Sequence, residues 1–522
     1  MSLIRAATTV GGMTLLSRIV GMVREILMAR YLGAGFAADA FLVAFRLPNL
    51  FRSLFAEGAF SAAFVPLVSQ QLGKEMDEAD GRLRAVRLTE QALAVLFPVL
   101  LLFTIVIMLA ASPIVWAMTG GFEDRSPEKL ELTVQLTRLA FPYLMLISLA
   151  SLLGGLLNAL GRFWVYAAAP ILLNLTFIIG FLLFRGTTPI ETATMQAAAI
   201  AVAGILQFLW LCWDCWRIGV LPRLTWPRLT PEVKTLLKRI GPAAIGAGAT
   251  QINLLVSTMI AARNLPEGSV SYLYYADRLN QLALGMIGVG MGVALLPTMG
   301  RLLGAGNNEA AIHQQNRGIE FVLLFGLPAS VALIVSADPI VAALFQHGEF
   351  TRADRIACAA ALKAFSTGLV AYMLVKVLTP GFHARGDTRT PMLIALGAIA
   401  LNLTGNLLLS RMLDHVGIAV ATSISAWVNV AVLALVLIRR ADWHPDGGLT
   451  KSVPRMLAAA LLMAGMLLAL NPIVLPLAEG SLAGRAMGML LLVGGGGLVY
   501  AGIGLLIGAW SPRQLLNSFR RG

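Results

Sequence analysis

The chain has 522 residues, of which 58% are hydrophobic and 13% are charged. Soluble globular domains have about 25% charged residues, so this composition excludes that class and predicts a polytopic membrane protein. The formal net charge of +13 would indicate a nucleic-acid partner for a soluble protein. In a membrane protein it reflects the excess of Lys and Arg in cytoplasmic loops, so no nucleic-acid partner is expected.

Apolar segments of spanning length recur along the whole chain. A helix needs about 20 mainly apolar residues to cross the hydrocarbon core. The N-terminal stretch MSLIRAATTVGGMTLLSRIVG has no small-residue cleavage site after a short apolar core, so it is predicted to be the first span. The fourteen predicted spans lie near 5–32, 37–70, 88–112, 131–158, 164–184, 192–215, 238–262, 270–300, 318–337, 355–383, 390–410, 416–438, 454–474 and 486–508.

The charges in the connections predict the orientation of the chain. Cations are concentrated in three connections, at 74–87, 217–239 and 439–455, and in the C-terminal tail. The alternate connections are poor in cations, as in GAGFA near 33–37 and LPEGS near 265–269. Because cytoplasmic loops carry the excess of Lys and Arg, both termini are predicted to face the cytoplasm. An even number of spans agrees with this orientation.

Two pairs of similar segments indicate an internal repeat. ADAFLVAFRLPNLF, which begins at Ala38, resembles SYLYYADRLNQLAL, which begins at Ser271. This alignment pairs Arg46 with Arg278 at an offset of 232 residues. The second pair is LLNALGRF and GFHARGDT. The order of the matches is the same in both halves of the chain, which favours a repeat over chance similarity between apolar helices.

The repeat predicts an all-α membrane protein with two pseudo-symmetric six-helix lobes around a central cavity, followed by two C-terminal helices. Parallel repeats of this kind are typical of transporters that work by alternating access. The predicted divisions are 1–218 and 238–440 for the lobes, 219–237 for a cytoplasmic linker, and 441–522 for the two additional helices and a basic cytoplasmic tail.

Five arginines lie within segments that are apolar enough to cross the membrane. They are Arg18, Arg24, Arg46, Arg52 and Arg278. An arginine at the centre of a spanning helix costs about 2.5–3.5 kcal/mol unless it faces a water-filled cavity or an anionic partner. The chain is therefore predicted to bind something negatively charged within the membrane.

Helical spacing divides these cations according to their neighbours. In the second span, offsets of four and seven residues place Asp39, Arg46 and Glu57 on one face, so Arg46 is predicted to pair with Asp39. In the first span, Arg18 and Glu25 share a face. The cations predicted to remain available for a ligand in these two spans are Arg18, Arg24 and Arg52.

The second half of the chain has further polar positions. Asn253 and Ser257 lie on a polar stripe of the seventh span, and Asp277 and Gln281 lie near Arg278 on the eighth. The run GMIGVGMGVALLP follows on the eighth span. Because no strand precedes this run, it is predicted to be a tightly packed helix and not a phosphate-binding loop. The predicted cavity wall includes residues from both halves.

Motifs for catalysis and cofactor binding are absent from the sequence. The pattern GxxxxGK[ST] does not occur, so nucleotide hydrolysis is not expected. The five histidines and three cysteines lack ligand spacing, and the CxxC of Cys212 and Cys215 lies on a Trp-rich helix end, so no metal or cofactor is predicted. Guanidinium groups form bidentate, charge-assisted hydrogen bonds with phosphate. Converging arginines in a membrane cavity would suit a diphosphate, and the expected activity is transport of an anionic substrate by a protein that is not an enzyme.

One long segment, TLLSRIVGMVREILMARYLGAGFAADAFLVAFRLPNLFRSLFAEGAFSAAFVP, has the pattern of a known family. Later segments agree with it, namely QINLLVSTMIA, YLYYADRLNQLALGMIGVGMGVALLP and GFHARGDTRTP. Together they resemble the MurJ (MviN) lipid II flippases of the multidrug/oligosaccharidyl-lipid/polysaccharide (MOP) exporter superfamily. The resemblance covers essentially the whole chain.

The resemblance implies fourteen transmembrane helices in the bacterial cytoplasmic membrane. It implies that the protein moves lipid II, the undecaprenyl-diphosphate-linked disaccharide-pentapeptide, from the inner to the outer leaflet for peptidoglycan synthesis. The implied substrate-binding residues are Arg18, Arg24, Arg52 and Arg278, with Asp39 and Glu57 as acidic positions that matter. The last two helices would hold the polyprenyl tail. The expected partners of a monomeric protein are lipid II, the bilayer and peptidoglycan synthases.

The chain departs from some relatives at Ser257, where they have an acidic residue linked to sodium binding, so sodium coupling is not predicted. Three other functions are weighed against this one. A multidrug exporter of the same superfamily would need surplus carboxylates in its cavity. A flippase for another diphosphate-linked glycan would have the same cavity charge, and only the family signature argues against it. A membrane glycosyltransferase would need an extramembrane loop with an acid/base or metal constellation, which 216–237 lacks.

Overall fold

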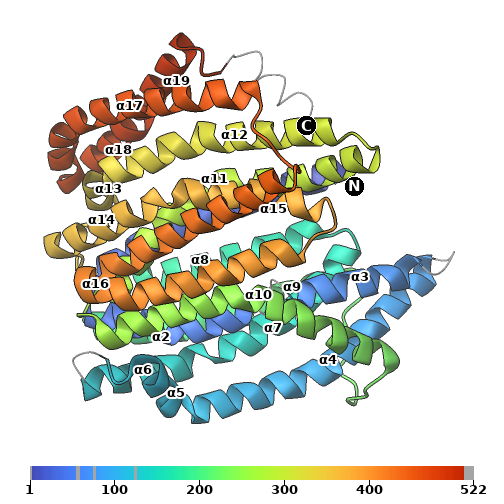
Figure 1. The fold of residues 1–522 in the computed structure, drawn as a ribbon. Helices are drawn as coiled ribbons and strands as arrows, with labels where there is room; N and C mark the ends of the chain where they lie inside the picture. Colours follow the sequence, from blue (N-terminus) through green and yellow to red (C-terminus); the bar gives the residue numbers. More distant parts are fainter. Residues whose placement is uncertain (1–2, 54–58, 74–77, 123–125, 511–522) are drawn as a thin grey trace. The chain divides into compact units, whose positions relative to one another are not determined.

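The computed structural model describes residues 3–53, 59–73, 78–122 and 126–510, and the regular structure within these ranges is helical (Figure 1). The chain divides into two compact units, Met1–Ser271 and Tyr272–Gly522. The helices that lie in the first unit are α1 (Leu3–Leu32), α2 (Phe36–Phe51), α3 (Ala59–Gly73), α4 (Glu78–Leu109), α5 (Ala111–Thr119), α6 (Pro127–Ala140), α7 (Pro142–Ala159), α8 (Phe163–Leu183), α9 (Pro189–Arg217) and α10 (Pro231–Asn264).

The second unit begins three residues into the helix that follows. Its helices are α11 (Ser269–Gly304), α12 (Asn308–Val335), α13 (Ala337–Phe345), α14 (Arg352–Thr367), α15 (Leu369–His383), α16 (Arg389–Arg439), α17 (Gly447–Glu479), α18 (Leu482–Leu490) and α19 (Gly496–Leu506). A π-helical segment, Leu491–Gly495, joins α18 to α19. The glycine-rich run GMIGVGMGVALLP lies inside α11, which confirms that it is a helix.

The described part of every predicted span coincides with one or more of these helices. One interruption has a clear cause in the sequence. The span predicted at 131–158 is divided between α6 and α7 because Pro142 has no N–H group and begins the second helix. Nine helical stretches among the described residues are long and apolar enough to cross a membrane.

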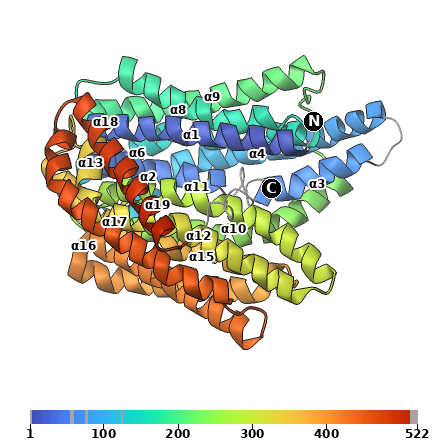
Figure 2. The ribbon, with the colours of Figure 1, turned by 90° about the horizontal axis from the view of Figure 1, so that it is seen from above.

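Within each unit the helices pack along one another. In the first unit, α8 packs against both α1 and α9 (Figure 2). In the second unit, α17 packs against α12 and α13. Pro170 lies inside α8, and α7 is buried on most of its faces. These packed helices position the polar side chains described below.

The continuous element α16 is a folded-back pair of helices. Asp414 has φ 49° and ψ −135°, which is not helical. The Asn402 side chain donates to Oγ1 of Thr422 at 3.1 Å. In a straight helix these two residues would be about 30 Å apart, at 1.5 Å for each residue. The two predicted spans, 390–410 and 416–438, are therefore separate helices that meet side by side.

A substitution of Gly405 tests this pairing. A Cβ atom at Gly405 would lie 2.9 Å from Cβ of Ala421, on the returning helix. Gly405→Ala is therefore expected to destabilise the second unit by about 1–3 kcal/mol, the usual cost of overpacking. Gly397→Ala is the matched control on the same helix, because a Cβ there meets nothing within 4 Å. Thermal unfolding of the purified protein measures both, and equal melting temperatures would contradict the packing.

The repeated motifs LLNALGRF and GFHARGDT have the same local structure. Gly161 and Gly386, which the sequence alignment pairs, both have left-handed backbone conformations with φ of 77° and 79°. Glycine is the residue that adopts this conformation without steric cost. The residue that follows each of these glycines forms an ion pair. The motif supplies the cation, Arg162, in the first case and the anion, Asp387, in the second. Arg162 pairs with Asp214 through Nε and Oδ2 at 2.7 Å.

In the second motif, Asp387 pairs with Arg440 at 2.7 Å. Hydrogen bonds from the Thr390 side chain and backbone, and then the bond from Arg440, hold the pKa of Asp387 well below its usual range. Arg385, also in this motif, pairs with Asp442 through Nε and Oδ1 at 3.0 Å. These ion pairs join the connection before α16 to the connection after it. The motif therefore has a structural role.

Candidate functional site

Arg24 is held between α1 and α8. Its Nη1 donates to Oδ1 of Asn174 at 3.0 Å, and its Nη2 forms an ion pair with Glu25, which is 3% exposed. The guanidinium carbon lies 5.3 Å from the centroid of the Phe177 ring. Asn174 also donates to the backbone carbonyl of Ser17 at 3.0 Å. Arg24 therefore has protein partners that helical spacing does not predict, because a buried carboxylate is its neighbour in sequence.

Arg18 and Arg52 line one cavity of about 470 Å³ inside the first unit. Arg18 is half-buried, and it has no hydrogen-bond or ion-pair partner among the residues that the structure describes. It shares a helix face with Glu25 as predicted, but Glu25 pairs with Arg24. Arg52 directly follows α2 and donates through Nε to Oδ1 of Asn49 at 3.1 Å. Two cations from different helices therefore converge on the same cavity.

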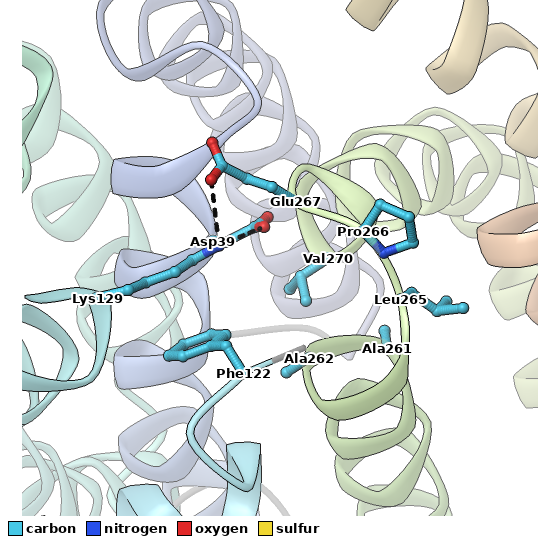
Figure 3. A pocket seen from close by; sticks show the side chains of 9 residues that line it. All are labelled: Asp39, Phe122, Lys129, Ala261, Ala262, Leu265, Pro266, Glu267 and Val270. Atoms are coloured by element: carbon cyan, nitrogen blue, oxygen red, sulfur yellow. Dashed lines mark hydrogen bonds and ion pairs between the residues drawn. The ribbon is translucent and has the colours of Figure 1, made fainter. Parts of the chain in front are cut away.

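Asp39 lies in a second, separate polar cluster (Figure 3). It is 3% exposed, and its Oδ2 lies 3.4 Å from Nζ of Lys129 on α6. The carboxylate also accepts hydrogen bonds from the backbone N–H groups of Gly268 and Ser271, at 2.8 and 3.0 Å, and from the Ser271 hydroxyl at 2.6 Å. Asp39 thus satisfies backbone donors at the beginning of α11, which lack partners within that helix.

Lys129 is the least expected member of this cluster. It is 2% exposed, and its Nζ lies 3.9 Å from Oε2 of Glu267. The same ammonium group lies 4.8 Å from the centroid of the Phe122 ring and 5.7 Å from that of Phe36. The other oxygen of Glu267 accepts from the Phe36 backbone N–H at 2.7 Å. Carboxylates and ring faces thus surround a buried cation, as burial of a charge requires.

Arg46 binds α10 and does not pair with Asp39. Its Nε donates to Oγ1 of Thr258 at 3.0 Å, and its Nη2 donates to the Leu254 carbonyl at 3.3 Å. The predicted pairing with Asp39 is therefore wrong. Residues seven apart share a helix face, but they are about 10.5 Å apart along the axis. The neighbouring helices supply closer partners for both residues.

The remaining predicted residues of the first unit lie on α10 or outside the described residues. Asn253 is half-buried on α10, and its Oδ1 has no hydrogen-bond partner among the described residues. The Ser257 hydroxyl donates to the Asn253 backbone carbonyl at 2.8 Å. Glu57 lies outside the described residues.

In the second unit, Asp277, Arg278 and Gln281 lie together on one stretch of α11. The Gln281 side chain donates to Asp277. The Arg278 guanidinium carbon lies 4.8 Å from the centroid of the Tyr274 ring. The described predicted residues of the first unit therefore lie in four places. These are around Arg24, around the cavity of Arg18 and Arg52, around Asp39, and at the contact of Arg46 with α10, the helix that carries Asn253. The residues on α11 are a separate group in the second unit.

Comparison with known proteins places the chain among membrane transporters. A family model described as lipid II flippase MurJ matches residues 28–487. The probable lipid II flippase MurJ of Rhizobium tropici is 43% identical over 474 residues, which cover 90% of this chain and 87% of that protein. The lipid II flippase MurJ of Burkholderia cenocepacia is 34% identical over 475 residues, which cover 90% of each protein.

Solved structures show the same fold. A lipid II flippase MurJ in an inward closed conformation superposes with a TM-score of 0.77 at 24% identity, covering 97% of this chain and 99% of that one. An inward-facing multidrug resistance transporter of the MATE family gives a TM-score of 0.68 at 17% identity, covering 82% and 97%. The family model and the sequence relatives together cover most of the chain, and the chain therefore belongs to the MurJ lipid II flippase family.

Proposed function

We propose that this protein moves lipid II from the inner to the outer leaflet of the bacterial cytoplasmic membrane. The observation that carries the proposal is the convergence of Arg18 and Arg52 on one cavity of about 470 Å³. No Asp or Glu of the described chain lines that cavity. Its charge is therefore positive, and it suits the diphosphate that joins the lipid to its sugars. The names of the sequence relatives support lipid II as the substrate.

The chemistry of guanidinium supports this assignment. Its planar fork binds phosphate oxygens in pairs, and it stays protonated at every physiological pH. A multidrug exporter for organic cations would need carboxylates where this cavity has arginines. A flippase for a different diphosphate-linked glycan would share the arginines, but the sequence relatives do not favour it. Arg24 and Arg278 are proposed as further substrate-binding residues, and Glu25, Asp39, Arg46, Glu57, Asn253, Asp277 and Gln281 as wall or gate residues.

Alternating access is the proposed mechanism. In it, lobes 1–218 and 238–440 reorient around the bound headgroup, residues 219–237 link them, and the helices within 441–522 hold the polyprenyl tail. Fourteen spanning helices and cytoplasmic termini are part of the proposal, which the helix bounds and the loop charges support. The protein acts as a monomer beside peptidoglycan synthases. It has no ATPase motif, so an ion gradient, the membrane potential or consumption of the product drives transport.

A leaflet-accessibility assay tests the function directly. Cells depleted of the protein are expected to lose lipid II from the outer leaflet, and an impermeant reagent or enzyme that modifies lipid II measures the exposed fraction. Restoring the wild-type gene on a plasmid is the control, and it is expected to return exposure to its original level. Unchanged exposure in depleted cells would contradict the proposed function.

A further inference from the structure

The connection between α9 and α10 exposes large apolar side chains beyond the ends of both helices. It comprises residues 218–230, which contain no helix and are called the linker segment here. Trp226 is 86% exposed, and Leu224 and Leu229 are 62% and 59% exposed. Three large apolar side chains that are this close in sequence and this exposed indicate a surface that another molecule covers.

A short repeat keeps the linker segment out of the flanking helices. The sequence PRLT occurs at 222–225 and again at 227–230, with Trp226 between the two copies. Each proline lacks an N–H group and restricts the residue before it to non-helical conformations. The apolar side chains are therefore carried by a stiff backbone, which loses little conformational entropy when it binds.

The end of α9 indicates the level at which the linker segment begins. Trp213 and Trp216 lie near this end, and they are 45% and 68% exposed. The Arg217 guanidinium carbon lies 5.8 Å from the centroid of the Trp213 ring. Exposed tryptophans beside a cation at the end of a helix of spanning length are typical of the headgroup layer. The linker segment therefore begins in that layer.

Contacts with α4 place the rest of the linker segment at the same level. The Arg223 backbone N–H donates to Oε1 of Glu90 at 2.9 Å, and the Thr230 hydroxyl donates to Oε1 of Gln91 at 3.0 Å. Glu90 and Gln91 directly precede residues 92–109, an uncharged run of α4 that is long enough to span the hydrocarbon core. Two points of the linker segment are thus held at the boundary of the hydrocarbon, with Trp226 between them.

Positive charge surrounds the exposed apolar side chains. Residues 217–239 include six Lys and Arg residues and one carboxylate, Glu232. Arg223 and Arg228, one in each copy of PRLT, are exposed, and neither guanidinium group has a hydrogen-bond or ion-pair partner among the described residues. Guanidinium binds phosphate oxygens in pairs. The charge of this surface therefore suits a layer of phosphates.

We propose that the linker segment is a membrane anchor that binds the headgroups of anionic phospholipids. Leu224, Trp226 and Leu229 enter the headgroup layer, and Arg223 and Arg228 each bind a lipid phosphate. Water is present in this layer, so a backbone without internal hydrogen bonds is tolerated there, as it would not be in the hydrocarbon. The position at the lipid boundary and the excess of cations favour a lipid surface over a protein partner.

A depth measurement in defined lipids tests the anchor. Full-length protein with Thr225→Cys and Cys212→Ser is labelled with a nitroxide at position 225, which is exposed, while Cys215 and Cys358 are buried and do not react. The nitroxide is expected to be less accessible to a water-soluble nickel chelate in nanodiscs that contain phosphatidylglycerol than in phosphatidylcholine alone. A label introduced by Ala305→Cys, in the exposed connection between α11 and α12, is expected to be equally accessible in both.

A pair of charge variants separates the two arginines from the general positive charge. Arg223→Gln with Arg228→Gln is expected to abolish the difference between the two lipids at position 225. Lys238→Gln with Arg239→Gln is the matched control, because it removes the same charge from exposed positions on α10, outside the linker segment. This control is expected to keep the difference.

The apolar side chains have their own variant. Leu224→Ser with Trp226→Ser is expected to make the label fully accessible in both lipids, as at position 305. All substituted side chains of the linker segment are exposed, so the melting temperature is expected to stay unchanged.

Three results would overturn the anchor. They are equal accessibility of position 225 in the two lipids, full accessibility in both, and the same loss from the two charge variants. Amide hydrogen exchange of the unsubstituted protein provides a second measurement if a labelled variant does not fold. Residues 218–230 are expected to exchange more slowly with phosphatidylglycerol present, and unchanged exchange would also overturn the anchor. Neither measurement depends on which substrate the protein moves.

Discussion

Lys129→Met is expected to destabilise the first unit by about 3–5 kcal/mol. The substitution keeps the length of the side chain and removes the ammonium group that lies 3.4 Å from the Asp39 carboxylate. Both side chains are almost fully buried. Breaking one half of a buried ion pair leaves the other charge without compensation, which accounts for the size of the effect. Thermal or denaturant unfolding of the purified protein measures it.

Two further variants separate loss of charge from loss of packing. Lys234→Met is the control, because Lys234 is exposed at the beginning of α10, and a change within about 0.5 kcal/mol is expected there. In the double variant, Lys129→Met with Asp39→Asn, the buried carboxylate charge is also removed. The double variant is expected to be more stable than Lys129→Met alone. If Lys129→Met unfolds like the wild type, the buried pair has no structural role.

Removing both cavity cations is expected to abolish function without unfolding the protein. In Arg18→Ala with Arg52→Ala, the cavity loses its positive charge, and each lost charge-assisted hydrogen bond is worth about 1.5–3 kcal/mol. Each arginine should therefore account for at least about tenfold in affinity for the diphosphate. The measurement is growth of a flippase-depleted strain, together with the amount of protein in the membrane fraction.

Conservative and distant substitutions provide the controls for this experiment. Lysine at both positions keeps the charge but not the planar fork, so partial growth is expected. Arg138→Ala removes an exposed arginine that donates to the Met108 carbonyl and does not line the cavity, and it should support normal growth. Arg24→Ala is less informative, because it would also leave the buried Glu25 without its ion-pair partner. Full growth with both cavity arginines removed would refute the diphosphate site.

The helices could be predicted because each is encoded by a local run of apolar residues. The division of α16 into two helices is an example. The sequence predicts an interruption between 410 and 416, where RMLDHVG introduces charge and a glycine, and the backbone leaves the helical conformation at Asp414. The left-handed glycines Gly161 and Gly386 could likewise be matched from the sequence, since each motif specifies its own turn.

The polar partners could not be predicted in the same way, because they depend on packing between distant segments. Lys129 lies in PEKLEL, whose charges are typical of a solvated first turn, and it is buried only because α2 packs on α6. Arg46 and Thr258 are 212 residues apart. Gln207 is a single polar residue in an apolar run, and its hydrogen bond to the Ala169 carbonyl is visible only once α8 and α9 are packed together.

The reversed ion pairs at the two repeated motifs have a consequence for how the chain assembles. The two segments that carry these motifs enter the membrane one after the other, and a motif could dock on the helix that binds the other motif. Correct docking joins Arg162 to Asp214 and Asp387 to Arg440. If each motif docked on the helix that binds the other motif, Arg162 would face Arg440 and Asp387 would face Asp214. The two charges in each of these pairs have the same sign and would repel. The opposite polarity therefore disfavours an exchange of the two motifs during folding.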